Sequence, residues 1–89
     1  PGDQHLYSNT GYTLMAYIVE RVSGQSLRKF AEANIFKPLG MTRTVFRDDH
    51  AIVVKGQAYA YRPGPNSSFN LSVPNYDTVG ASSLVTTVE

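Results

Sequence analysis

The stretch YSNTGYTLMAYIVERVSG, residues 7–24, decides the fold, because its apolar residues recur with the period of an amphipathic helix. These apolar positions form one stripe: Leu14, Met15, Ile18, Val19 and Val22. Glu20 and Arg21 fall on the opposite face, as in a helix with one side toward solvent. We therefore predict a helix over most of this stretch.

The two ends of this helix carry capping signals. Asn9 or Thr10 is expected to cap its start, because a short side-chain oxygen accepts a hydrogen bond from an otherwise unpaired backbone N–H. Gly24 is expected to end it, since glycine adopts the left-handed conformation that follows a last turn at little cost. Because only Gly24 and Gln25 precede Ser26, the cap of a second helix, the two helices should meet in a tight corner.

The second helix has a short apolar face, and residues that stop a helix follow it. Its apolar residues are Leu27, Phe30, Ala31 and Ile35. Pro38 lacks the N–H that would continue the helical hydrogen bonds, and Gly40 favours a turn, so the helix should stop there.

After Met41 the helical period is lost. Residues 44–46 are expected to be extended, and residues 57–61 to form a strand. Residues 62–78 hold many turn-forming residues and are expected to form a long loop, and residues 80–85 a short helical turn. The predicted fold class is therefore α+β, with two helices followed by irregular chain and short strands.

The length allows at most one small domain, and the charged residues make it nearly neutral. The 89 residues include 8 basic and 7 acidic ones, so a net charge of +1 gives no strong field to attract nucleic acid or an anionic membrane. The apolar fraction of 42% is ordinary for a globular protein. The chain has no cysteine, which excludes disulfides and thiolate chemistry within it. No apolar run approaches the roughly 20 residues that a membrane-spanning helix needs.

Three short stretches carry a family resemblance. They are YSNTGY at residues 7–12, ERVSG at residues 20–24 and IFKPLGMTRT at residues 35–44. In this order and spacing they resemble the serine β-lactamase and penicillin-binding-protein-like family. Within it, the chain is most similar to the branch of class C β-lactamases, carboxylesterases and D-amino-acid peptidases. The resemblance is strongest over residues 1–46 and implies a place in the mainly helical lobe of that fold.

The resemblance also implies a chemistry. Such enzymes combine a Ser-x-x-Lys nucleophile, a Tyr-x-Asn element and a Lys-Thr-Gly or His-x-Gly strand. By this resemblance Tyr7 would be catalytic and exchange a proton with the serine and the leaving group. Asn9 would bind the amide of a small-molecule acyl substrate. No metal and no organic cofactor would be needed, and a periplasmic or secreted location is favoured.

The other two elements of that set are not found at the expected places. The nucleophile should lie before Tyr7 and the third element well after residue 85, so residues 1–89 are interpreted as a partial domain that is cut at both ends and catalytically silent alone. The stretch TTVE at residues 86–89 matches a capping box, the start of a further helix. The alternative is a non-catalytic module with the family's shape that serves in binding or assembly. The apolar stripes of both helices are expected to pack on further polypeptide, so the isolated piece should self-associate or expose an apolar patch.

Some matches are rejected on chemical grounds. Ser26 and Lys29 fit Ser-x-x-Lys, but they follow the Tyr-x-Asn element instead of preceding it, so Ser26 is interpreted as a cap. Asp48, Asp49 and His50 include metal-ligand types, but three adjacent residues do not readily point at one ion, so no metal site is predicted. Serines at positions 82 and 83 stand where the family often has two glycines, so the backbone there was expected to differ.

Overall fold

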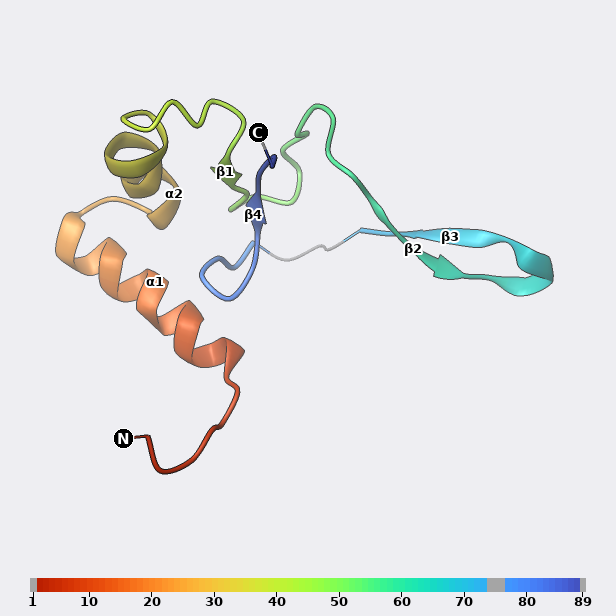
Figure 1. Ribbon diagram of the computed structural model, residues 1–89, viewed down its shortest axis with the longest axis horizontal. Helices are drawn as coiled ribbons and strands as arrows, with labels where there is room; N and C mark the ends of the chain where they lie inside the picture. The colour runs from red at the N-terminus through yellow and green to blue at the C-terminus, as the bar shows by residue number, and fades with distance from the viewer. Residues whose placement is uncertain (1, 74–76, 89) are drawn as a thin grey trace.

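The computed structural model describes residues 2–73 and 77–88 of the chain, so Pro1, residues 74–76 and the Glu89 of the predicted capping box lie outside it. Two helical elements lie on one side of the molecule, and a long hairpin projects from the other side (Figure 1). A small sheet between them pairs the middle of the chain with its C-terminal end. The α+β fold class predicted from the sequence is confirmed.

Helix α1 spans Asn9–Ser23, as the apolar period predicts. Its N-cap is Ser8, whose side chain accepts a hydrogen bond from the Gly11 N–H at 3.0 Å, so the prediction of Asn9 or Thr10 as the cap was wrong. The helix therefore begins one residue earlier than a cap at Asn9 would allow. Its end is as predicted: Gly24 has a φ of 72° and donates its N–H to the Glu20 carbonyl.

Helix α2 spans Leu27–Ala31 and continues as a π-helical segment, Glu32–Phe36. Ser26 caps it by accepting a hydrogen bond from the Lys29 N–H at 3.3 Å, which confirms its predicted structural role. The helical segment ends at Phe36, two residues before Pro38. The Leu39 N–H still donates to the Ile35 carbonyl at 3.1 Å, and Gly40 follows with a φ of 69°.

The small core lies where α2 meets the first strand. Ala31 and Phe36 are buried, and the Phe36 ring lies 6.0 Å from the Phe46 ring, centre to centre. This is an ordinary spacing for a favourable aromatic pair. On α1, Ala16 alone is buried and Val19 is half-buried, whereas the rest of the predicted apolar stripe stays exposed: Leu14 is 56% exposed and Ile18 is 59% exposed.

The first small sheet joins two distant segments. Strand β1, Val45–Phe46, lies antiparallel to β4, Leu84–Val85. The extended conformation predicted for residues 44–46 is thus confirmed, but the helical turn predicted for residues 80–85 was wrong. Pairing with a strand far away in the sequence provides hydrogen bonds that no local pattern reveals.

The second sheet is a hairpin of β2, Ala60–Pro63, and β3, Phe69–Ser72, joined by the 3-10 turn Pro65–Ser67. The predicted strand at residues 57–61 is real but lies further along, and the predicted loop at residues 62–78 contains β3. Positive φ angles at Asn66 (55°) and Ser67 (59°) reverse the chain. The turn-forming residues that suggested a long loop therefore make the tip of a hairpin.

The segment before β4 packs closely on α1. A Cβ placed on Gly80 would collide with the backbone of Tyr12 and lie 3.0 Å from the Ala16 Cβ. Glycine is required there because the two backbones approach each other so closely. Among the residues described, no helix is both long enough and apolar enough to cross a bilayer.

Candidate functional site

The Tyr-x-Asn element lies at the start of α1, on either side of the residue that caps it. Ser8 has an extended backbone, with φ −144° and ψ 110°, and Asn9 is the first helical residue. Tyr7 therefore lies just before the helix and Asn9 in its first turn, so both residues lie at its N-terminal end. That end carries partial positive charge from unpaired N–H groups, which favours anions and developing negative charge.

The cap at Ser8 has a consequence for Asn9. Because the Ser8 hydroxyl oxygen accepts the Gly11 N–H, the Asn9 carboxamide is not used for capping. Among the described residues, the hydrogen bond at Asn9 is made by its backbone carbonyl, which accepts from the Thr13 hydroxyl at 3.0 Å. Tyr7 is 82% exposed. The phenol and the carboxamide are therefore presented outward, available to groups beyond this chain.

Helix α1 is held in place by the segment that leads into β4. Gly80 fits against the Tyr12 backbone, within the first turn and a half of the helix. Ser83 in this segment has a φ of 75°, in the left-handed region that glycine adopts most easily. The backbone at Ser83 thus has a conformation that glycine adopts more easily than serine. Whether it differs from that of family members with two glycines stays a prediction. Its hydroxyl donates to the Thr78 carbonyl at 3.0 Å.

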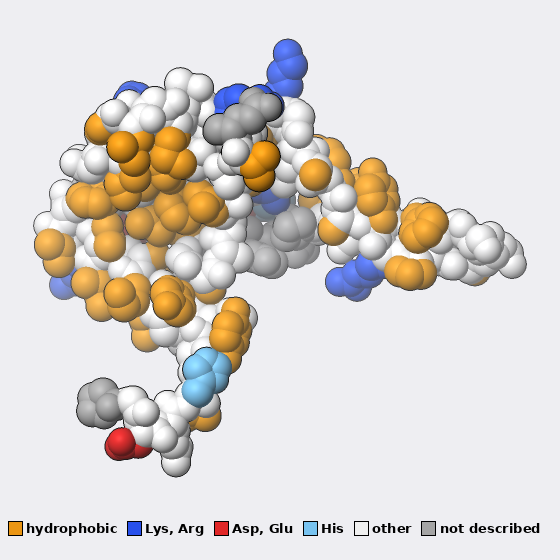
Figure 2. All heavy atoms as spheres, viewed as in Figure 1, with side chains coloured by type: hydrophobic (Ala, Val, Ile, Leu, Met, Phe, Trp, Pro, Cys, Tyr) orange, Lys and Arg blue, Asp and Glu red, His pale blue; other side chains and the backbone are white. Residues whose placement is uncertain are grey.

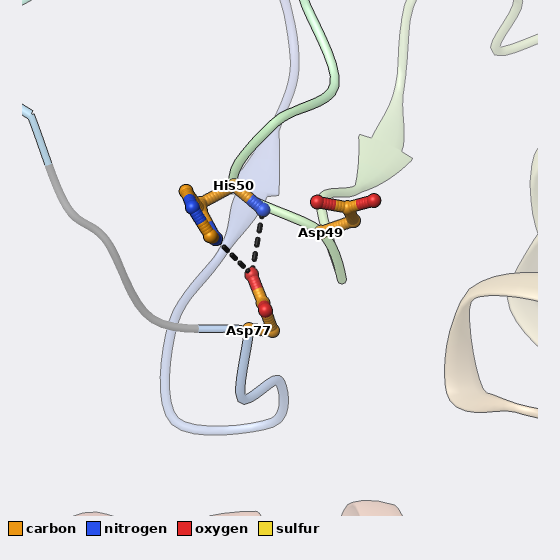
Figure 3. Close-up of side chains that lie close together, drawn as sticks. All are labelled: Asp49, His50 and Asp77. Atoms are coloured by element: carbon orange, nitrogen blue, oxygen red, sulfur yellow. Dashed lines mark hydrogen bonds and ion pairs between the residues drawn. The ribbon is translucent and has the colours of Figure 1, made fainter.

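A second group of polar side chains joins two loops (Figure 3). One carboxylate oxygen of Asp77 accepts the His50 backbone N–H at 2.6 Å and lies 2.7 Å from the His50 ring Nδ1. Asp49 lies beside them and accepts the Ala51 N–H at 2.8 Å. The hydrogen bond from the His50 backbone, and then that from its ring, hold the pKa of the exposed Asp77 carboxyl below its ordinary value.

This group has some features of a metal site. The ligand atoms of Asp49, His50 and Asp77 all lie within 4.8 Å of one another. Asp48, the other acidic residue considered from the sequence, is turned away and pairs with Arg28 at 3.0 Å. Hydrogen bonds between His50 and Asp77 explain the position of these two side chains without an ion, whereas Asp49 accepts from the Ala51 N–H instead. The absence of a metal site stays a prediction. Sequence reasoning missed Asp77 because it lies 27 residues from His50.

Comparison with known proteins identifies the family of the chain. The family model described as beta-lactamase matches residues 1–89, the whole chain. A solved structure, the octameric penicillin-binding protein homologue from Pyrococcus abyssi, superposes with a TM-score of 0.79 and is 31% identical in sequence. This superposition covers 99% of the present chain and 20% of that homologue.

Curated relatives match about half of the chain. A candidate D-alanyl-D-alanine carboxypeptidase of Escherichia coli (strain K12) is 50% identical over 46 residues. Its counterpart from Salmonella schwarzengrund (strain CVM19633) is 41% identical over 46 residues. Each match covers 52% of this chain and 11% of the relative.

The chain is thus related to a penicillin-binding protein homologue and to proteins named as D-alanyl-D-alanine carboxypeptidases. It belongs to the β-lactamase family, in its β-lactamase and penicillin-binding-protein-like group. It spans only about a tenth of the length of the curated relatives that it matches, 11% in each case.

Proposed function

We propose that these 89 residues are an internal part of a serine acyl-hydrolase that works through an acyl-enzyme, with Tyr7 and Asn9 as their contribution to its active site. The observation that carries this proposal is the position of the two side chains at the N-terminal end of α1, with the cap assigned to Ser8. That arrangement leaves the phenol and the carboxamide for substrate and nucleophile. The family membership supplies the reaction class.

The two side chains suit different steps of acyl transfer. A nearby lysine cation favours the deprotonated form of a phenol. The phenolate can then take the proton of an attacking serine hydroxyl. The same phenol can return the proton to the leaving group. A carboxamide both donates and accepts hydrogen bonds, so Asn9 can recognise the amide of an acyl substrate. The nucleophile and the third element would come from polypeptide beyond these residues.

The substrate class follows from the relatives. The curated proteins with up to 50% identity bear the name of D-alanyl-D-alanine carboxypeptidases, and their matches cover 46 residues. We therefore favour a peptide that ends in D-amino acids, with β-lactams and small esters as alternatives that undergo the same acylation. No metal or organic cofactor is part of this proposal.

A matched pair of tyrosine variants tests the proposed role of Tyr7. In a protein that also contains the missing elements, Tyr7→Phe should lower kcat/KM for a D-alanyl-D-alanine peptide by about 10²–10⁴-fold, the usual contribution of acid–base catalysis. Tyr12→Phe removes a similar phenol on α1, 65% exposed, and should leave the rate unchanged. Unchanged kinetics with Tyr7→Phe, in a protein with an unaltered melting temperature, would remove Tyr7 from the mechanism.

A second candidate function is assembly, and one finding favours it. The Pyrococcus abyssi homologue is described as octameric, and its superposition covers 99% of this chain. We infer that the protein containing this chain self-associates as well.

A further inference from the structure

Residues 77–83 form a loop that leads into β4, and hydrogen bonds fix both of its ends. At the start, one carboxylate oxygen of Asp77 accepts the His50 backbone N–H at 2.6 Å and lies 2.7 Å from the His50 ring Nδ1. At the end, the Ser83 carbonyl accepts the Arg47 N–H at 2.8 Å, and β4 then pairs with β1. Both ends are therefore attached to β1 and to the turn that follows it (Figure 3).

This part of the chain is in turn fixed to α2 and its π-helical continuation. The Asp48 carboxylate pairs with the Arg28 guanidinium of α2 at 3.0 Å, and both side chains are partly buried. The Phe46 ring of β1 packs on the Phe36 ring. The loop of residues 77–83 thus has a firm base on the second helix.

The middle of the loop presses on the N-terminal part of α1. A Cβ on Gly80 would collide with the Tyr12 carbonyl oxygen and lie 3.0 Å from the Ala16 Cβ. Tyr12 is three residues after Asn9, the first residue of the helix, which is roughly 4.5 Å along the axis. The contact therefore lies close to the end of α1 that presents Tyr7.

The other end of α1 is joined to α2 through the corner at Gly24. A helix of 15 residues is roughly 22 Å long, so a tilt of about 3° at this corner moves the N-terminal end by roughly 1 Å. A misplacement of about 1 Å can cost a reaction a factor of about 10². A support near the N-terminal end is therefore important for any chemistry there.

We propose that Asp77 and Gly80 are positioning residues for Tyr7: Asp77 fixes the loop of residues 77–83 to His50, and Gly80 lets that loop hold the N-terminal turns of α1 in place. This inference rests on the proposed role of Tyr7 in acyl transfer. Neither residue needs to touch the substrate.

Three carboxylate variants test the attachment at Asp77, in a protein that also contains the missing elements. Asp77→Ala removes the acceptor and should lower kcat/KM for a D-alanyl-D-alanine peptide by about 10–100-fold. Asp77→Asn keeps an oxygen that accepts the same bonds and should stay within about threefold of the wild type. The control Asp49→Ala removes the neighbouring carboxylate, which accepts from Ala51 instead, and should leave kcat/KM unchanged.

A double variant shows whether Asp77 acts through Tyr7. Residues that act as a unit have non-additive effects on catalysis. In a Tyr7→Phe background, the loss caused by Asp77→Ala should therefore be at least about threefold smaller than in the wild type. A loss of protein stability alone would lower both rates by the same factor. All rates are measured well below the melting temperature of each variant.

A pair of glycine variants tests the contact with α1. Gly80 has a φ of 110° and Gly56 a φ of 79°, so alanine is strained at both positions. Only the Cβ at Gly80 would meet α1, since nothing lies within 4 Å of a Cβ at Gly56. Gly80→Ala should lower kcat/KM at least about tenfold, whereas Gly56→Ala should leave it unchanged. If Gly80→Ala does not fold, the Asp77 variants decide the question.

The results separate this inference from the proposal on which it rests. Wild-type kinetics in folded Asp77→Ala or folded Gly80→Ala would overturn the positioning role, while a loss with Tyr7→Phe would keep the hydrolase proposal. An equal loss from Asp77→Ala with and without the Tyr7 hydroxyl would also overturn it. Unchanged kinetics with Tyr7→Phe would overturn both the catalytic role of Tyr7 and its positioning.

Discussion

Ser8 is the residue that determines how Tyr7 and Asn9 are presented. Its hydroxyl oxygen accepts the Gly11 N–H at 3.0 Å and so satisfies one of the unpaired donors at the start of α1. A cap at Asn9 would have tied the carboxamide to the backbone of its own helix. Because Ser8 makes this bond instead, the residue between the two proposed site residues has a structural role, and they remain available for chemistry.

This role predicts a stability effect for Ser8 that its neighbours do not share. Ser8→Ala should lower the free energy of unfolding by about 1 kcal/mol, the usual cost of a lost N-cap. Ser8→Asp should retain most of the stabilisation by the cap, since a carboxylate also accepts the capping hydrogen bond and suits the positive end of a helix. Thr10→Ala is the control and should change little. Chemical denaturation measures all three, and a larger loss with Thr10→Ala than with Ser8→Ala would contradict the assigned cap.

Single residues also show what the sequence can and cannot predict. Gly24 and Ser26 were assigned correctly, because a C-terminal glycine and a capping serine act within one turn of their own helix. Ser8 was missed because three consecutive residues, 8–10, all have side chains that can cap. Asp77 could not have been placed beside His50, since only the folded chain brings residues 27 positions apart together.

At the level of elements, the glycine inside α1 and the glycine at its end have opposite effects on stability. Gly24 has a φ of 72°, where an added Cβ is strained even though nothing lies within 4 Å of it. Gly11 lies inside the helix, and an added Cβ would meet the Ser8 Oγ at 3.5 Å, an ordinary contact. The same substitution should therefore have opposite effects at the two positions.

We expect Gly24→Ala to lower the free energy of unfolding by about 1–2 kcal/mol, because alanine resists the left-handed conformation. Gly11→Ala should raise it by up to about 1 kcal/mol, because alanine favours the helix. Thermal or chemical unfolding, followed by circular dichroism, measures both changes. A Gly24→Ala variant as stable as the wild type would show that the left-handed conformation of Gly24 does not matter for the end of the helix.

Elements made from local signals were predicted better than elements made from distant partners. Both helices were recognised, because their apolar periods and caps lie within the segment itself. Strand β4 was taken for a helical turn, and β3 for part of a loop, since each depends on a partner strand. In β3 the pairing of Leu71 with Tyr61 provides the contact that the short segment lacks alone.

For the whole molecule, the solvent-accessible surface is larger than that of a compact monomer of the same mass. A compact monomer of 9.8 kDa should expose roughly 5,200 Å², by the usual scaling of area with mass. The chain exposes 7468 Å², and its radius of gyration is 16.0 Å where roughly 12 Å is expected for this length. Many hydrophobic side chains are exposed on the visible face of the helices (Figure 2). This excess supports the proposal that further polypeptide packs on α1.

The apolar stripe of α1 tests that proposal directly. In the 89-residue chain Ile18 is 59% exposed, so Ile18→Ala should cost less than about 1 kcal/mol of unfolding free energy there. If further polypeptide covers the stripe, the same change in the longer protein should cost about 2–5 kcal/mol, as in a core. Glu20→Ala, on the opposite face, should cost little in both. Chemical denaturation of the four variants measures the differences. Equal costs of Ile18→Ala in the two contexts would show that the stripe faces solvent in the longer protein too.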